Sequence, residues 1–154
     1  MDRTLLLIKP DALQRELVGE IISRVERKGL RLVGLKMLNL TPEILDEHYN
    51  HLRHLEFFDE IKSFMSSLPI IASCWEGVDC VETVRRLCGT TKAREAAPGT
   101  IRGDLAMSIQ TNLVHASDSA ETALQEITRF FQPAELFSYK DSLSYFRYSS
   151  REAQ

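Results

Sequence analysis

The order in which strand and helix patterns follow one another limits this chain to very few folds. Four short apolar runs are typical of strands: Thr4–Lys9, Leu30–Leu40, Pro69–Glu76 and a run that begins at Leu113. Apolar residues at helical spacing fill most of the chain between and after these runs. The resulting order is strand, helix, strand, then further helices, then strand, helix, strand. A strand apolar on both faces, such as Leu5–Ile8, is expected at the centre of a sheet.

Local start and stop signals support these boundaries. Gly29 is expected to end the first long helix, and Thr41-Pro42-Glu43 is typical of a helix start. We expect Asp11 and Asp79 to cap two further helices. The segment Gly89–Thr111 shows little periodicity and is expected to be a long loop inserted before the last strand. Together the pattern predicts one α+β domain over residues 1–154, a ferredoxin-like (βαββαβ) sandwich with a four-stranded antiparallel sheet and helices packed on it.

Charge and cysteine content exclude several classes of protein. The chain has 154 residues and a net charge of −3, which argues against non-specific nucleic-acid binding driven by overall charge. The apolar run Leu5–Ile8 is too short for a signal peptide or a membrane span. Three cysteines without Cys-x-x-Cys spacing indicate reduced, buried thiols, so we expect a cytoplasmic protein.

One histidine is placed where a catalytic group would be useful. Leu113 and Val114 run into His115, and residues that favour turns and helix caps follow before an apolar helical stripe. His115 is therefore expected at a strand end beside a helix N-terminus, which favours anions. Glu126, further along that helix, could hold the imidazole in one tautomer. A nucleophile for phosphoryl transfer fits this place, although a lone histidine there is also compatible with an ordinary surface or core residue.

The chain also supplies cations for phosphate. Lys9, Arg85 and Arg102 lie at a strand end, a helix end and in the long loop, respectively. An arginine near a helix C-terminus is favourable for the helix dipole alone, so Arg85 has a structural explanation too. Neither a phosphate-binding Gly-rich loop with Lys-Ser/Thr nor the protein-kinase motif set is present in the sequence.

Three histidines at spacings of three could suggest a metal site. His48, His51 and His54 follow one another on a predicted helix, but no carboxylate or cysteine pattern completes a ligand set. We interpret them as one polar helix face and predict no metal held by protein side chains. The following pattern, Phe57–Met65, predicts a helix whose stripe is mostly core.

The chain resembles a nucleoside diphosphate kinase from Arg3 to about Tyr148. The resemblance rests on motifs that occur in family order and spacing: Ile8-Lys9-Pro10-Asp11, Leu17–Ile22, His48-Tyr49, Phe57-Phe58, Pro98–Asp104 and Asn112–Ser119. It implies a ping-pong reaction in which a nucleoside triphosphate gives its γ-phosphoryl to His115 and a nucleoside diphosphate takes it away. It also implies low base specificity and Mg²⁺ that bridges the nucleotide phosphates without a main protein ligand.

The resemblance assigns a role to each remaining site residue. Tyr49 would lie beside the histidine, and Ser117 and Glu126 would fix its imidazole. Phe57 would stack on the base, and Asn112 would bind the ribose. Lys9 would hold the ribose hydroxyl and the region of the transferring phosphate. Phosphate binding would come from three further side chains: Arg85, Thr91 and Arg102.

Four positions depart from the family pattern. Ala116 and Glu16 stand where glycine is usual, Gln110-Thr111 replaces Gly-Arg, and Ala93 replaces a proline. Alanine resists positive φ, so Ala116 implies either that no positive φ is needed or that the turn is strained. None of the four removes a residue that carries chemistry, so we expect an active enzyme.

Two other functions remain open at this point, and so does the assembly. A ferredoxin-like module that binds nucleotide without catalysis would need the cations but not His115. An RNA-recognition domain is disfavoured by the acidic charge and the lack of an aromatic RNA-binding strand motif. The resemblance implies a homo-oligomer, and we expect a hexamer rather than a tetramer, without membrane or specific nucleic-acid partners.

Overall fold

A four-stranded antiparallel sheet forms the centre of the computed structural model, which describes residues 1–140 and 142–152. The strands are β1 (Asp2–Ile8), β2 (Arg31–Leu38), β3 (Ile70–Gly77) and β4 (Val114–Ala116). They lie in the order β2-β3-β1-β4, with all three pairings antiparallel. The ferredoxin-like prediction is confirmed, and each predicted strand exists within a few residues of its expected bounds.

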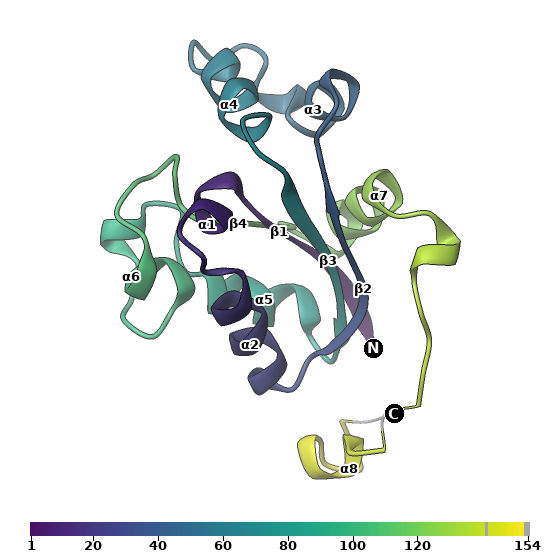
Figure 1. Cartoon of the computed structure of the whole chain (residues 1–154). Coiled ribbons are helices and arrows are strands. Elements are labelled where there is room, and N and C mark those ends of the chain that lie inside the picture. Colours follow the sequence, from purple (N-terminus) through teal and green to yellow (C-terminus); the bar gives the residue numbers. More distant parts are fainter. Residues whose placement is uncertain (141, 153–154) are drawn as a thin grey trace.

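Helices cover both faces of this sheet (Figure 1). The described α-helices are α1 (Pro10–Gln14), α2 (Val18–Lys28), α3 (Pro42–His48), α4 (Phe58–Met65), α5 (Cys80–Cys88), α6 (Ile101–Leu105), α7 (Ala120–Phe130) and α8 (Ser144–Arg147). Helices α2 and α5 lie on one face and α7 on the other, while α3 and α4 stand together beyond one end of the sheet. No described helix is both long and apolar enough to span a bilayer.

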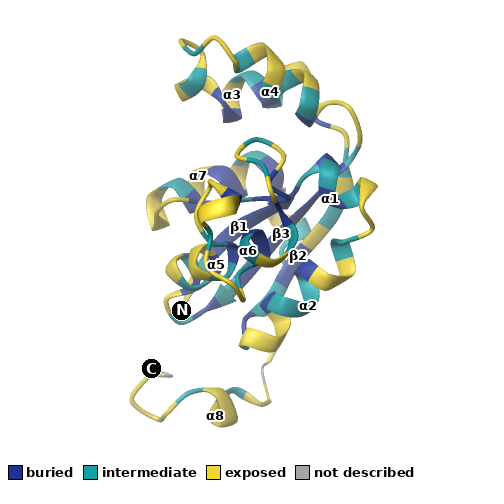
Figure 2. Cartoon of the chain, turned by 90° about the vertical axis from the view of Figure 1, so that its left-hand side faces the viewer, coloured by how far each residue is buried: buried dark blue, intermediate teal, exposed yellow. Residues whose placement is uncertain are grey.

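Strand β1 is buried on both faces, as its continuous apolar run predicted. Leu6 and Ile8 pack into the core under α2 and α5, whereas Leu5 and Leu7 pack into the core under α7. The sheet in Figure 2 is accordingly dark blue along β1 and β3. His115 of β4 lies opposite Leu7 in the register, so its side chain is directed to the α7 side.

The predicted helix boundaries are confirmed at some ends and wrong at others. Thr41 caps α3 through its side chain, and Gly29 ends α2 with a φ of +104°. Asp11 does not cap α1, because its carboxylate instead accepts a hydrogen bond from the N–H of Leu113. Asp79 stands at the N-cap position of α5 but has a φ of +48° and makes no capping hydrogen bond. At both aspartates, the surrounding structure overrides the local preference.

The helix predicted to run through His51 is also shorter than expected. Helix α3 ends at His48, and a separate 3₁₀ turn, η1 (Asn50–Leu52), follows it. His48 is buried, so the interpretation of the histidines as one polar helix face is wrong. The apolar side chains of α4 are less buried than predicted. Met65 is the one fully buried residue of this helix, and Phe57 stands exposed just before it.

The insertion Gly89–Thr111 is held against the domain rather than being a free loop. It contains a 3₁₀ turn, η2 (Ala93–Glu95), and the short helix α6, whose N-cap is Thr100. Nη1 of Arg24 in α2 forms an ion pair with Asp104 at 2.7 Å and also donates to the carbonyls of Gly99 and Thr100. These contacts fasten the insertion to α2.

Two departures from the family pattern now have a structural reading. Ala116 does not adopt a positive φ, so alanine is unstrained there. Glu16 has a φ of +57°, a left-handed conformation that costs an ordinary residue about 1–2 kcal/mol and that glycine would adopt freely.

The C-terminal segment returns to the edge strand β2. The Phe137 N–H donates to the Val33 carbonyl at 2.8 Å, and the Tyr139 hydroxyl donates to the Leu32 carbonyl at 2.7 Å. At these contacts the tail packs across its own domain. Beyond them Tyr145 and Phe146 stand exposed with their rings 4.0 Å apart.

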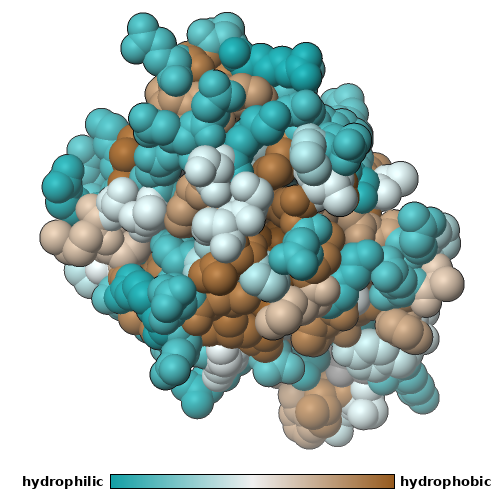
Figure 3. Space-filling view, turned by 45° about the horizontal axis from the view of Figure 1, so that its top comes forward, coloured by the Kyte–Doolittle hydropathy of each residue, from teal (hydrophilic) through white to brown (hydrophobic). Residues whose placement is uncertain are grey.

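The rest of the β2 edge remains open and partly apolar. Leu35 is 49% exposed and Met37 is 62% exposed. Figure 3, in which the top of Figure 1 comes forward, shows apolar side chains gathered across the middle of the visible face. The molecule therefore presents uncovered apolar surface together with a sheet edge, a combination that often marks an interface.

The backbone at Ala93 suits proline. Ala93 is the first residue of η2, where proline is tolerated, and Lys92 before it is extended, as a residue preceding proline prefers. Ala93→Pro should therefore raise the free energy of unfolding by about 0.4–1 kcal/mol, because proline restricts the unfolded chain. Thermal unfolding would show this as a melting temperature higher by about 1–4 °C. A lower melting temperature would mean that the ring does not fit this buried position.

Candidate active site

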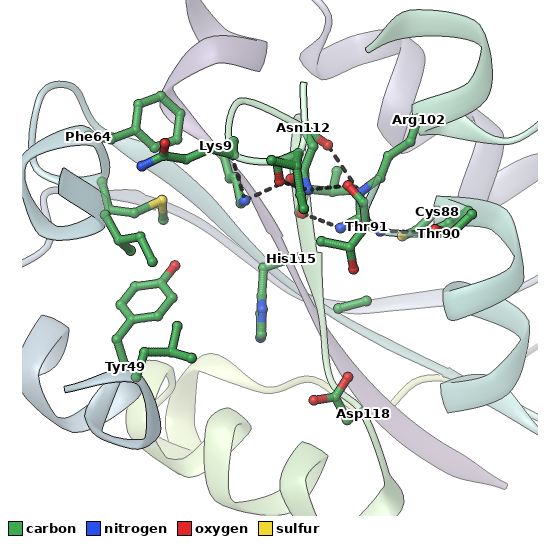
Figure 4. Close-up of a pocket in the computed structure, with 18 of the residues that line it drawn as sticks. Lys9, Tyr49, Phe64, Cys88, Thr90, Thr91, Arg102, Asn112, His115 and Asp118 are labelled. Carbon is green, nitrogen blue, oxygen red and sulfur yellow. Dashed lines mark hydrogen bonds between the residues drawn. The ribbon is translucent and has the colours of Figure 1, made fainter. Parts of the chain in front are cut away.

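A cavity of about 610 Å³ opens where β1, β4 and the insertion meet α4 (Figure 4). This volume is in the range of small-molecule sites. Eight of the ten predicted site residues line it: Lys9, Tyr49, Phe57, Arg85, Thr91, Arg102, Asn112 and His115. The other two, Ser117 and Glu126, lie behind His115 and contact it or each other. The sequence thus identified residues that the fold brings together from distant parts of the chain.

His115 is held through one of its two ring nitrogens. Its Nε2 lies 2.9 Å from Oε1 of Glu126, and the Ser117 hydroxyl donates to Oε2 of the same carboxylate at 2.5 Å. A carboxylate accepts hydrogen bonds, so this geometry places the imidazole proton on Nε2 and leaves the Nδ1 lone pair free. The His115 side chain is 22% exposed and points into the cavity in Figure 4.

Glu126 is kept ionised by these partners. Burial by itself would raise the pKa of the Glu126 carboxyl, but the hydrogen bond and charge of His115, together with the Ser117 hydrogen bond, lower that pKa to about 2. A permanently negative carboxylate behind the imidazole favours any positive charge that develops on the ring. The predicted role of Glu126 and Ser117 as fixers of the imidazole agrees with these contacts.

A tight turn immediately before β4 sets the position of the histidine. Leu113 has a φ of +74°, and the Val114 N–H donates to the Asn112 carbonyl at 2.9 Å, which closes a three-residue γ-turn. A non-glycine residue in such a conformation costs about 1–3 kcal/mol. Two hydrogen bonds hold it: Leu113 N–H donates to the Asp11 carboxylate at 3.0 Å, and the Leu113 carbonyl accepts from the Lys9 N–H at 2.8 Å.

Lys9 and Asn112 form a polar pair on the cavity wall. The Lys9 Nζ donates to Oδ1 of Asn112 at 2.7 Å, and the Asn112 amide nitrogen donates to the carbonyls of Thr91 and Ile109. Burial, followed by the positive charge of Arg102, lowers the pKa of the Lys9 ammonium to about 8. An anion in the cavity would offset both effects, because it attracts the ammonium and the guanidinium alike.

The two arginines differ in how freely they can reach a ligand. Arg102 is buried and donates to three main-chain carbonyls, those of Gly89 at 2.6 Å, Val114 at 2.7 Å and Asn112 at 3.3 Å. It therefore supplies a fixed positive charge and also fastens the insertion to β4. Arg85 is more exposed and forms an ion pair with Asp118, a cavity residue that the sequence did not indicate.

Apolar and aromatic groups also line the cavity. Phe57 is 45% exposed at the start of α4, and Ile109 of the insertion also lines the cavity with much of its side chain exposed. The Tyr49 ring is buried, and its hydroxyl is directed into the cavity in Figure 4. Burial, then the charge of Glu126, raises the pKa of that hydroxyl, which stays protonated.

His48 is a neighbour of the site that the sequence did not identify. Its ring lies 4.6 Å from that of His115 at an angle of 80°, although the pattern suggested a solvated position. His48, His115 and Glu126 each offer a ligand atom within 4.8 Å of the others, which could suggest a metal site. However, an Arg129 nitrogen lies 3.2 Å from Nδ1 of His48, and a guanidinium at that lone pair disfavours a second cation.

Comparisons with known proteins agree on one family. A family sequence model described as "Nucleoside diphosphate kinase" matches residues 2–136. A "Nucleoside diphosphate kinase" of Parabacteroides distasonis is 58% identical over 140 residues, covering 91% of this chain and 92% of the relative. "Nucleoside diphosphate kinase 3" of Homo sapiens is 46% identical over 147 residues, covering 96% of this chain and 87% of the relative.

A solved structure extends the similarity to three dimensions. A halophilic nucleoside diphosphate kinase from Halobacterium salinarum in complex with CDP superposes with a TM-score of 0.94 at 41% identity, covering 96% of this chain and 99% of that one. The fold of this chain therefore matches a relative that was solved with a nucleotide bound.

The lowered pKa of Lys9 predicts a pH dependence of stability. The folded protein loses this proton near pH 8, whereas the unfolded chain keeps it to about pH 10.5. The cost of burying the charge is thus fully present below pH 8 and is relieved as the pH rises to 10.5. Wild type should gain stability over this interval relative to Lys9→Gln.

Urea unfolding of both proteins at several pH values between 7.5 and 10.5 measures the difference. Other groups that titrate there are common to both proteins and cancel. Parallel curves for the two proteins would contradict a depressed Lys9 pKa.

Proposed function

Since the chain belongs to the nucleoside diphosphate kinase family, we propose that His115 is the residue that carries the phosphoryl group between its two nucleotide substrates. Enzymes of this family transfer the γ-phosphoryl of a nucleoside triphosphate to a nucleoside diphosphate by a ping-pong mechanism. The observation that carries the proposal is the free Nδ1 of His115, which faces the cavity while Nε2 is held by Glu126.

The chemistry follows from that geometry. The Nδ1 lone pair attacks the γ-phosphorus, the bond from phosphorus to the β–γ bridging oxygen breaks, and a nucleoside diphosphate leaves. A terminal oxygen of the second diphosphate then attacks the same phosphorus, and the N–P bond breaks. Glu126 stabilises the ring in both steps, because its negative charge balances the positive charge of the substituted imidazole.

We assign the nucleotide contacts from the lining of the cavity. Arg85, Thr91 and Arg102 are proposed to bind phosphates, and Lys9 lies where it can contact both phosphate and sugar. Asn112 is fixed beside Lys9 and suits a ribose hydroxyl. The relative from Halobacterium salinarum was solved with CDP, which supports a nucleotide in the corresponding fold.

A divalent metal completes the substrate. Members of the family generally use a metal ion such as Mg²⁺. Asp118, a carboxylate of the cavity lining, is paired with Arg85, and the other charged groups there are cations. This set of donors suits phosphate rather than Mg²⁺, so we propose that the ion enters on the nucleotide phosphates and neutralises their charge.

The assembly is proposed to be a hexamer. Family members are typically oligomeric. The partly uncovered β2 edge and the exposed apolar side chains beside it support association with further copies. Sedimentation equilibrium separates the expected hexamer from a tetramer by mass, and a tetramer would contradict this proposal.

A covalent intermediate should be found on His115. After incubation with γ-labelled ATP and Mg²⁺, we expect acid-labile label on this residue, because phosphohistidine hydrolyses in acid. His115→Gln should abolish labelling, and the matched control His54→Gln, an exposed histidine outside the cavity lining, should not. Label that persists in His115→Gln would overturn the mechanism. Nucleotide binding without any label would favour a binding module instead.

The enzyme should tolerate all common bases. Only Phe57, with Ile109 near the same opening, is proposed to reach the base, and an aromatic face stacks on any base. Purines should be preferred modestly, by about 1 kcal/mol. The kcat/KM values for adenine, guanine, cytosine, uracil and thymine diphosphates with one donor measure this. A spread of about 10⁴-fold would require hydrogen bonds to base edges and would contradict these assignments.

A further inference from the structure

Arg129 reaches the interior of the site from the far side of α7. It lies one turn after Glu126, and its NH1 atom is 3.2 Å from Nδ1 of His48. Its Nε lies 2.8 Å from a carboxylate oxygen of Glu47 at the surface. A guanidinium only donates hydrogen bonds, so His48 Nδ1 must be the acceptor. His48 is therefore neutral, with its proton on Nε2.

The protonation state of His48 determines which of the two histidines donates a hydrogen bond to the Glu126 carboxylate. Oε1 of Glu126 lies 2.9 Å from Nε2 of His115 and 3.7 Å from Nδ1 of His48. If Nδ1 of His48 carried a proton, it would need only a small movement to donate to the same oxygen. His115 would then lose its exclusive acceptor and could move its own proton to Nδ1, the atom that must be free for attack.

We propose that Arg129 is a positioning residue for phosphoryl transfer, which keeps His48 deprotonated at Nδ1 and so reserves Glu126 for His115. This inference rests on the proposed role of His115. Arg129 is not among the residues that line the cavity, and its contact toward the site is with His48, so it acts through that residue.

The surroundings of His48 agree with a neutral ring. Burial first, then the charge of His115, lower its pKa; Glu126 opposes them, and Arg129 and His51 add to the lowering, which brings the pKa to about 3. These charged and titratable groups come from β4, α7 and η1. The uncharged contacts are the rings of Tyr49 and Phe130, which also pack edge to face with His48.

Arg129→Leu removes the donor while keeping an apolar stem in the helix. Nitrogen-detected NMR of histidine rings between pH 5 and 8.5 should show His48 neutral with Nε2–H in wild type. In Arg129→Leu, we expect protonation at His48 Nδ1 and a mixture of His115 tautomers. The pH below which kcat/KM falls should be about one unit higher in Arg129→Leu than in wild type, the usual scale for loss of a nearby charge. At more acidic pH the variant should therefore be about tenfold less active than wild type.

Two comparisons separate this role from a structural one. Arg129→Lys keeps a cationic donor and should restore most of the wild-type profile. In a His48→Phe background, which has no Nδ1, Arg129→Leu should produce no further shift. Arg27→Leu, the same change at an exposed position of α2, should behave as wild type.

Each result points to one conclusion. A His115 tautomer and an acid limb that are unchanged in Arg129→Leu would overturn the inference, even with wild-type His115 labelled. An Arg129 effect of equal size in the His48→Phe background would also overturn it, because the arginine would not act through His48. Absence of label on wild-type His115 would instead overturn the proposed function.

Discussion

The strained turn at Leu113 is the constraint on which the site depends. It joins the start of β4 to the end of β1 through the Lys9 N–H and to α1 through the Asp11 carboxylate, so these three elements cannot move independently. The turn directs Asn112 toward Lys9 on one side and starts the strand that carries His115 on the other. Its cost is offset by these tertiary hydrogen bonds, which is how strained backbone persists at functional sites.

The site also holds two cations, Lys9 and Arg102, near each other before any ligand binds. Burial and the positive charge of Arg102 disfavour the Lys9 ammonium, and the fold already bears that cost before any ligand enters. An anionic substrate removes the repulsion and meets groups that need no further ordering. Arg102 illustrates the ordering, because three carbonyls hold its guanidinium in one place. Fixed charge of this kind acts strongly on a transition state.

The sequence predicted the sheet, the partner of His115 and the lining of the cavity, because strand alternation and family motifs are local signals. It failed where a side chain's partner comes from far along the chain. Asp11 was expected to cap a helix, but its carboxylate accepts a hydrogen bond from the N–H of Leu113, about a hundred residues away. His48 was placed on a solvated face, since nothing nearby in sequence shows that β4 and α7 cover it. Arg102 was predicted to bind phosphate, but the three carbonyls that hold its guanidinium could not be read from the sequence, because the folded insertion and β4 bring them together.

The tail that follows residue 136, where the match to the family model ends, limits which further strands can pair with the edge strand β2. By taking the carbonyls of Leu32 and Val33, Phe137 and Tyr139 occupy one half of the β2 border and leave the stretch near Leu35 and Met37 accessible. A strand of another molecule could therefore pair with only a short part of β2. Such shortening allows a closed, finite pairing while it discourages the unlimited strand addition that builds fibrils.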